Sequence, residues 1–316
     1  MDLNVGLKTS YNDFYAYYTK KHPDDLLAKE IRRNIDSWSD LEFELGQFTR
    51  QISPQRKEEF WSSEENMENE LAKYLEREVE KIHLEDMGTR EKTESEMFRS
   101  LTGFYKKNKE DIESLKSILE DGNNIKEYSF INFNFTDTLE RCLDILGERF
   151  HPVQISLYEK QKALHIHGSI RDCSIVLGVN DESQIANKNF RDSESKLRLI
   201  KSYINDDYGN TRTRDAHAII NRSDIICVFG MSLGKTDQTW WQYLVEWILK
   251  DHSRKLVIFT KEDGEYNVKK KTLQKEREIR KKFFDNGNIP DDMCASIPNE
   301  QIYVVINAEL FCINLV

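Results

Sequence analysis

The sequence predicts an α/β protein with a doubly wound, mostly parallel sheet and a large helical insertion. Three observations support this fold class. The chain has 316 residues, of which 38% are hydrophobic and 32% charged, with 5 prolines, and this composition is typical of a helix-rich globular protein. Apolar residues recur at helical spacing up to about residue 120. Beyond that point, short apolar runs alternate with helical segments, as in a parallel sheet that is covered on both faces.

The charge of the chain limits its partners. The net charge is −10, which argues against a protein that wraps nucleic acid, so we do not expect nucleic acid as a partner. Eight basic residues lie between Lys269 and Lys282. No aromatic side chains for base stacking are interleaved with them, and a solvated helix face explains them as well as a nucleic-acid patch does.

Hydropathy and cysteine content indicate where the protein works. The longest apolar runs, such as Ile225–Phe229, are far shorter than the roughly 20 residues of a membrane span, and the N-terminus has no signal-peptide pattern. We therefore expect a cytoplasmic protein without a membrane partner. The 5 cysteines are far apart and form no C-x-x-C pair, so neither a disulfide framework nor a zinc ribbon is indicated.

The first 120 residues have the periodicity of amphipathic helices. Ser10 can cap a helix whose residues Tyr11, Phe14, Tyr15 and Tyr18 share one face. Two longer stripes follow, Met67, Leu71, Tyr74, Leu75, Val79 and Ile82, then Leu101, Phe104, Tyr105, Ile112, Leu115, Ile118 and Leu119. They predict two long helices, and the charged residues between the stripes are expected to be solvated faces.

After a turn signal at residues 121–124, the pattern changes to strands. Strands are expected at residues 128–133, 164–167, 225–229, 255–259 and 302–306, and helices at 192–208 and 240–250. We expect the strands at 128–133, 225–229 and 256–259 to lie in one parallel sheet. Ligands bind at the carboxyl ends of parallel strands, so the polar residues that follow these strands deserve the most weight.

The first such residue is Asn134, at the end of the strand predicted at 128–133. Its amide can donate to and accept from a ligand, although a residue that only turns the chain would fit the pattern equally well. Thr136 or Asp137 can cap the helix that follows. We expect Asn134 to share a cleft with His167 and Ser232.

The second motif is the segment from His165 to Gly168. Alternation along a strand places His165 and His167 on the same side, and Gly168 allows another backbone or a ligand to approach closely. A metal pair is conceivable, but no further ligand at suitable spacing completes a site, so no metal is expected. A neutral imidazole suits general base catalysis, and His167, beside the glycine, is the better candidate.

The third motif follows the strand at 225–229. Gly230 and Ser232 could present backbone N–H groups and a hydroxyl to a phosphate or a ribose. The segment also fits the G-x-S-x-G pattern of serine hydrolases, for which only His252 lies downstream. The Walker pattern fails, because Phe229 stands where its first glycine is required.

Together, the ordered motifs resemble the bacteriophage abortive-infection AbiH family. They are Gly6-Leu7-Lys8-Thr9-Ser10-Tyr11-Asn12-Asp13-Phe14, Trp38-Ser39-Asp40-Leu41-Glu42, Phe133-Asn134-Phe135-Thr136, His167-Gly168, and Phe229-Gly230-Met231-Ser232-Leu233 with Asp237. The family is in turn remotely similar to sirtuin-like NAD-binding domains. The resemblance implies a Rossmann-like α/β core at residues 125–316, with residues 1–124 as a helical region inserted into it.

The resemblance also implies an activity, the hydrolysis of NAD when phage infection is sensed. Asn134 would orient the nicotinamide ribose and the attacking water, and His167 would act as the general base. Ser232 would hold ribose or phosphate, and Gly168, Gly230 and Asp237 would also contact NAD. NAD is then the substrate, and no metal is needed.

One part of the family pattern is expected to be missing. Members typically begin with an apolar strand and a Gly-Asn-Gly-Phe-Asp turn, of which only the last residue, Asp2, is present as a cofactor-binding candidate. We therefore expect the first strand and its phosphate loop to be absent from this polypeptide. Either a misassigned or truncated start or a loss of cofactor binding would explain this.

Two further functions remain open. The chain could be a non-catalytic sensor or scaffold that binds a phage or host protein through its helical region, which could also form a homo-oligomer. A nuclease that uses the basic residues at 269–282 is disfavoured, since no cluster of acidic metal ligands is recognisable.

Overall fold

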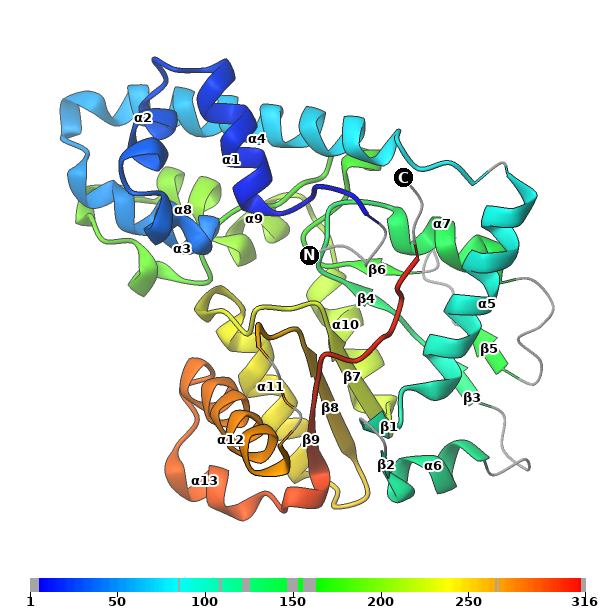
Figure 1. Cartoon of the computed structure of the whole chain (residues 1–316). Helices are drawn as coiled ribbons and strands as arrows, with labels where there is room; N and C mark the ends of the chain where they lie inside the picture. Colours follow the sequence, from blue (N-terminus) through cyan, green and yellow to red (C-terminus); the bar gives the residue numbers. More distant parts are fainter. Residues whose placement is uncertain are drawn as a thin grey trace.

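The computed structural model describes residues 6–84, 86–107, 110–120, 126–146, 153–155, 163–264, 266 and 268–313. Helices dominate one part of the molecule, and three parallel strands with their covering helices form another (Figure 1). Broadly, the protein is α/β, as expected. In the part of the chain that the structure describes, no helix has the length and apolarity needed to cross a membrane.

The helical part combines the N-terminal helices with two later ones. It contains α1 (Tyr11–Lys21), α2 (Leu26–Arg33), α3 (Leu41–Phe48), α4 (Lys57–Val79), α8 (Ser193–Leu199) and α9 (Lys201–Asp207), grouped at the upper left of Figure 1. The side chains of Ser10, Asp25 and Asp40 accept hydrogen bonds from the first turns of α1, α2 and α3. Such caps satisfy backbone N–H groups that the helix itself leaves without a partner.

Buried aromatic residues form the centre of the helical part. Phe14, Tyr15 and Tyr18 are at most 1% exposed, which confirms the predicted face of α1. The same hydrophobic core includes Phe190 and Leu199 from much later in the sequence. The helical part is therefore assembled from both sides of residue 124, and the predicted boundary there remains a prediction.

The stripe from Leu101 to Leu119 is not one helix, and this prediction was wrong. α5 (Met87–Gly103) ends at a glycine, and the short antiparallel strands β1 (Lys106–Lys107) and β2 (Glu110–Asp111) separate it from α6 (Glu113–Glu120). Phe104, Ile112 and Leu115 still pack in one cluster, whereas Leu101 belongs to the core of the helical part. Apolar spacing alone cannot distinguish one long helix from two elements that pack on the same surface.

The main sheet is parallel and covered on both faces. Its order is β7 (Ile225–Phe229), β8 (Lys255–Thr260) and β9 (Ile302–Ile306), and Val228 pairs with Ile258 and Ile258 with Val304. α10 (Arg212–Arg222), α11 (Gln238–Leu249) and α12 (Lys269–Asn286) share a core with one face, and residues of the α5–α6 region share a core with the other. The short helix α13 (Asp291–Ser296) precedes β9.

The strand predicted at 128–133 does not join this sheet. It is divided into β3 (Lys126–Tyr128), which pairs with β5 (Val153–Ile155), and β4 (Ile131–Asn132), which pairs with β6 (Leu164–His165). Both pairs are parallel, but the described residues form separate small sheets, so the prediction of one common sheet was wrong. A sirtuin-like Rossmann fold is therefore not established.

Candidate functional site

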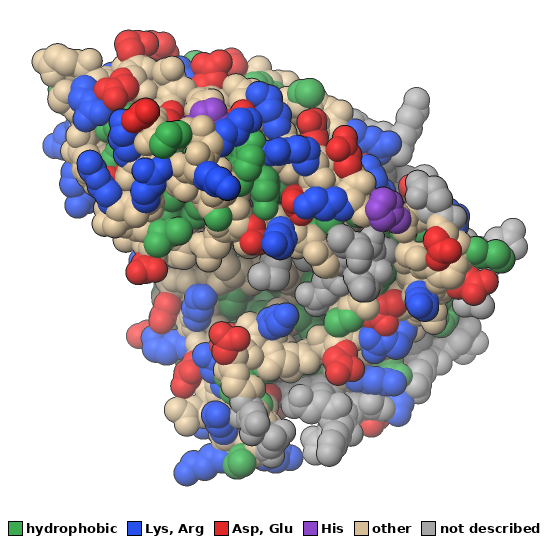
Figure 2. All heavy atoms as spheres, turned by 45° about the horizontal axis from the view of Figure 1, so that its top comes forward, with side chains coloured by type: hydrophobic (Ala, Val, Ile, Leu, Met, Phe, Trp, Pro, Cys, Tyr) green, Lys and Arg blue, Asp and Glu red, His purple; other side chains and the backbone are tan. Residues whose placement is uncertain are grey.

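A large cleft separates the helical part from the strands. Its volume is about 1740 Å³, and residues of α3, β4, β7 and the loops that follow these strands line it. Figure 2 shows the surface hollowed between the helical part, which comes forward there, and the part that carries β7 to β9. The carboxyl ends of β4, β6 and β7 therefore contribute to one depression in the surface.

Asn134 lies in the turn between β4 and α7 (Thr138–Ile145), and two neighbours fix that turn. Its N–H donates to Oδ1 of Asn132 (2.9 Å), and its carbonyl accepts from Nδ1 of His165 (2.9 Å). Asp137 stands at the N-cap of α7 without a side-chain capping bond. The backbone of Asn134 is thus held by β4 and β6 together, and the residue lines the cleft.

His165 has a structural role. Its Nε2 contacts Oε1 of Glu140 on α7, and both residues are buried. Burial alone would lower the pKa of His165, but the hydrogen bond and the charge of Glu140 raise it. Both ring nitrogens therefore have a partner within the fold, Nδ1 the carbonyl of Asn134 and Nε2 the carboxyl group of Glu140, so His165 is not the free base of the motif.

His167 has the properties of a general base. It follows β6, is 6% exposed, and lies edge-on to Phe133 with a ring-centroid distance of 5.4 Å. Burial lowers its pKa well below the usual value, and the positive charges of Lys201 and Arg212 lower it further. The imidazole is therefore neutral near pH 7. Among the described residues, its Nδ1 has no hydrogen-bond partner.

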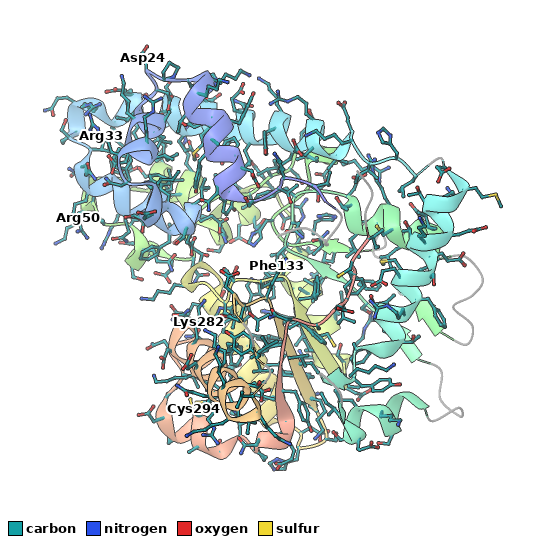
Figure 3. All side chains as sticks on the ribbon, viewed as in Figure 1. Asp24, Arg33, Arg50, Phe133, Lys282 and Cys294 are labelled. Carbon is teal, nitrogen blue, oxygen red and sulfur yellow. The ribbon has the colours of Figure 1, made fainter. Side chains whose placement is uncertain are left out.

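Phe133 links His167 to the helix after β7. Its ring also lies edge-on to Trp240 of α11, with a centroid distance of 5.4 Å. Figure 3 labels Phe133 near the middle of the molecule, at the upper end of the strands. The ring of His167 thus packs against Phe133. Oδ1 of Asp237 lies 3.9 Å from Nε2 of His167.

Gly168 allows two backbone segments to approach each other and does not line the cleft. Its φ is +75°, and a Cβ at this position would overlap the carbonyl oxygen of Ser174. The residue is buried and is not among the residues that line the cleft. Of the two predicted uses of this glycine, the structure shows the close approach of another backbone segment.

The loop after β7 presents Gly230 and Ser232 to the cleft. Nζ of Lys282 on α12 donates to the carbonyl of Ser232 (2.8 Å), which fixes the exposed serine, and Figure 3 labels this lysine above α12. His252, the partner that a serine hydrolase would need, precedes β8, whereas Ser232 follows β7. Because these strands are parallel, the two residues lie at opposite ends of the sheet, which argues against a serine hydrolase.

Sequence analysis missed the acidic residues that the helical part contributes to the cleft. Asp40 caps α3 through Oδ1, and its Oδ2 accepts from the hydroxyl of Thr236 (3.0 Å). Glu42 pairs with Lys201 of α9 (2.5 Å), and the side chains of both are at most 10% exposed. Burial raises the pKa of Glu42 to about 7 despite Lys201, and it also raises the pKa of Asp237.

The structure brings most of the predicted site residues together. Asn134, His167, Gly230, Ser232 and Asp237 line the same cleft. Gly168 lies behind them, as described above. Their chemical roles remain predictions.

The cleft does not have the ligands of a metal site. In the described ranges, no group of three or more His, Cys, Asp or Glu side chains could hold a metal ion. The predicted cofactor-binding residue Asp2 lies outside the residues that the structure describes.

Comparison with known proteins identifies a family. A family model described as bacteriophage abortive infection AbiH matches residues 1–259. No curated protein and no solved structure matches the chain.

Proposed function

The chain belongs to the bacteriophage abortive infection AbiH family and thus to a family of antiphage defence, and from this premise we propose that it is an NAD glycohydrolase. Phage infection activates the enzyme, and the loss of NAD arrests the infected cell. The observation that carries the proposal is the neutral, buried His167, whose ring lines the same cleft as Asn134 and Ser232. These are the general base and the two polar contacts that the reaction needs.

The reaction breaks the bond between C1′ of the ribose and the nicotinamide nitrogen. The electron pair of that bond goes to the ring nitrogen, so nicotinamide leaves as a neutral molecule. The oxygen of water forms the new bond to C1′, and the water proton passes to His167, directly or through a ribose hydroxyl. Positioning and a proton acceptor supply most of the assistance, because the leaving group needs no protonation.

Other residues of the cleft have positioning tasks in this proposal. Asn134 orients the ribose and the attacking water, since the hydrogen bonds from His165 and to Asn132 fix its backbone. Ser232 contacts ribose or phosphate from the loop after β7, where Lys282 holds its carbonyl. Lys282 also brings a positive charge to the side of the cleft that would face the phosphates.

The test measures NAD in infected cells. Bacteria that express the chain are challenged with a panel of phages, and NAD and nicotinamide are quantified by mass spectrometry through the infection. We expect at least one phage to trigger a fall in NAD with a matching rise in nicotinamide. The NAD level should stay constant in cells that express His167→Ala. In cells that express Asp24→Asn, a change at the exposed tip of the helical part (Figure 3), it should fall as with the wild type.

Protection without NAD loss would overturn the enzymatic proposal. If the wild type and His167→Ala protect cells equally while NAD stays constant, the cleft chemistry is not used. That result would favour a sensor or scaffold that acts through the helical part.

A further inference from the structure

We propose that three carboxylates on one side of the cleft, Asp40, Glu42 and Asp237, form an acidic wall that binds the cationic part of the substrate. Within it, Asp237 is a catalytic residue that stabilises the positive charge on the nicotinamide ring and at C1′ as the bond breaks. This inference rests on the proposed function for the identity of the cation.

The acidic wall is assembled from two distant parts of the chain. Asp40 and Glu42 belong to the start of α3 in the helical part, and Asp237 follows the glycine-containing loop after β7. The hydrogen bond between Asp40 and Thr236 joins the two segments (3.0 Å). All three carboxylates line the cleft that also contains His167.

Among the residues that the structure describes, the wall has more carboxyl groups than cations that act on them. Lys201 pairs with Glu42 and is the cation that acts on both Glu42 and Asp237 among the described residues. Arg212, the other cation that acts on His167, is within 3.6 Å of Asp172 and therefore already has a carboxylate partner. Among the described residues, one ammonium group, that of Lys201, faces three carboxyl groups, and the pKa of Glu42 is raised to about 7, so a bound cation would favour the ionised forms of these groups.

The pKa values agree with this imbalance. Burial is the largest cause of the raised pKa of Glu42. The charge of Lys201 opposes this shift, and the charges of Asp237 and Asp40 add to it. For Asp237, burial raises the pKa, Lys201 opposes that shift, and Asp40 adds to it. A carboxylate held in such a site gains stability from any positive charge that enters the cleft, because the effective dielectric constant there is low.

His167 supplies an independent indication of a ligand beside the wall. Its side chain is 8% exposed and lines the cleft, and its Nδ1 has no partner in the described part of the chain. Buried polar atoms of proteins normally have a hydrogen-bond partner, and an exception calls for an explanation such as a bound molecule. Nε2 of the same ring lies 3.9 Å from Asp237, so a molecule that contacts His167 lies next to the wall.

This arrangement suits the charge changes of the reaction. Before the bond breaks, the positive charge lies on the nicotinamide ring. As the bond breaks, the charge shifts to C1′ of the ribose, and it passes to His167 with the proton when water adds. A fixed carboxylate at this position stabilises the developing charge without reorganisation, which is an effective form of electrostatic catalysis.

The first test measures the preference of the cleft for a cation and does not depend on hydrolysis. N1-methylnicotinamide, which is cationic, and nicotinamide, which is neutral, are titrated into the wild type, Asp237→Asn and Asp24→Asn by calorimetry. We expect the wild type and Asp24→Asn to bind the cation about tenfold more tightly than nicotinamide, and Asp237→Asn to lose that preference. Equal binding of both probes by the wild type, or an unchanged preference in Asp237→Asn, would overturn the inference.

A second measurement separates the wall from the proposed activity. If NAD is hydrolysed, Asp237→Asn should lower kcat about a hundredfold with little change in KM, and Asp237→Glu should recover part of the rate. A preserved kcat in Asp237→Asn would show that the residue has no catalytic role. If the wild type prefers the cation but hydrolyses no NAD, the proposed function fails while the acidic wall stands.

Discussion

At the scale of single residues, His167 determines whether the proposed chemistry is possible. A group with a pKa well below the usual value for histidine stays unprotonated at cellular pH, and only that form can accept a proton. Replacing it should therefore remove catalysis without removing the site.

We predict that His167→Ala lowers the rate of NAD hydrolysis by about 10²- to 10⁴-fold, the usual contribution of a general base. Because the ring packs on Phe133, the more conservative His167→Gln is measured beside it, with thermal unfolding of both variants. A folded His167→Gln variant that hydrolyses NAD at the wild-type rate would exclude His167 as the base.

Asn134→Ala should affect the reaction differently. Its backbone is held by Asn132 and His165, so the turn should keep its shape when the side chain is removed. We expect kcat to fall by at least about tenfold, in line with the loss of a positioning group, while some NAD binding remains in an equilibrium titration. Weaker NAD binding with an unchanged kcat at saturation would show that Asn134 contacts the substrate without orienting the reaction.

Sequence reasoning found some of these residues and missed others for a physical reason. Asn134, His167 and Ser232 follow apolar strands, and the ends of parallel strands are where ligands bind. Asp40 and Glu42 lie in a helical region rich in charge, where an acidic residue is usually solvated. Glu42 is buried in the fold and pairs with Lys201 of the later helix α9, a contact that a local sequence pattern does not indicate.

At the scale of elements, the turn after β6 depends on one glycine. The left-handed backbone of Gly168 costs another residue about 1–2 kcal/mol, and its Cβ would also overlap the carbonyl of Ser174. We predict that Gly168→Ala lowers the melting temperature by several degrees and reduces activity with it. Gly103→Ala, at an open position in the last turn of α5, should be neutral or slightly stabilising, and equal melting temperatures of the two variants would contradict this account.

The contribution of Glu42 to the free energy of unfolding should depend on pH. The folded protein retains the proton of Glu42 up to about pH 7, whereas the unfolded chain loses it near the ordinary value of about 4.3. The free energy of unfolding of the wild type should therefore fall as pH rises between these values, by up to about 3 kcal/mol relative to Glu42→Gln. Urea unfolding of both proteins at pH 5 and pH 8 measures this difference, and parallel pH profiles would show that burial does not perturb Glu42.

Element boundaries were predicted less well than element types. The strands at 225–229 and 302–306 were predicted with their observed bounds, because apolar, β-branched runs of that length rarely form anything else. The segment at 128–133 has a similar composition but is divided between two pairs of strands. Its pairing depends on residues far away in the sequence, which composition does not specify.

At the scale of the whole molecule, the cleft joins parts that are far apart in the chain. The helical part supplies Asp40 and Glu42 of the acidic wall, Asn134 and His167 follow β4 and β6, and the segment after β7 supplies Ser232 and Asp237 (Figure 1). The sequence predicted the helical part and the parallel strands separately. Their docking includes partly buried polar contacts such as that between Asp40 and Thr236, which only the structure reveals.

The central claim is that this cleft hydrolyses NAD, and labelled water tests it most directly. Purified wild type, His167→Gln and Asp24→Asn are incubated with NAD in ¹⁸O-water, alone and with extract from phage-infected cells, and the products are analysed by mass spectrometry. We predict that the wild type and Asp24→Asn release nicotinamide and ADP-ribose in equal amounts, with ¹⁸O on C1′ of the ribose, and that His167→Gln releases neither above the level of extract alone. Intact NAD with the wild type under both conditions, or equal product from His167→Gln, would contradict the account.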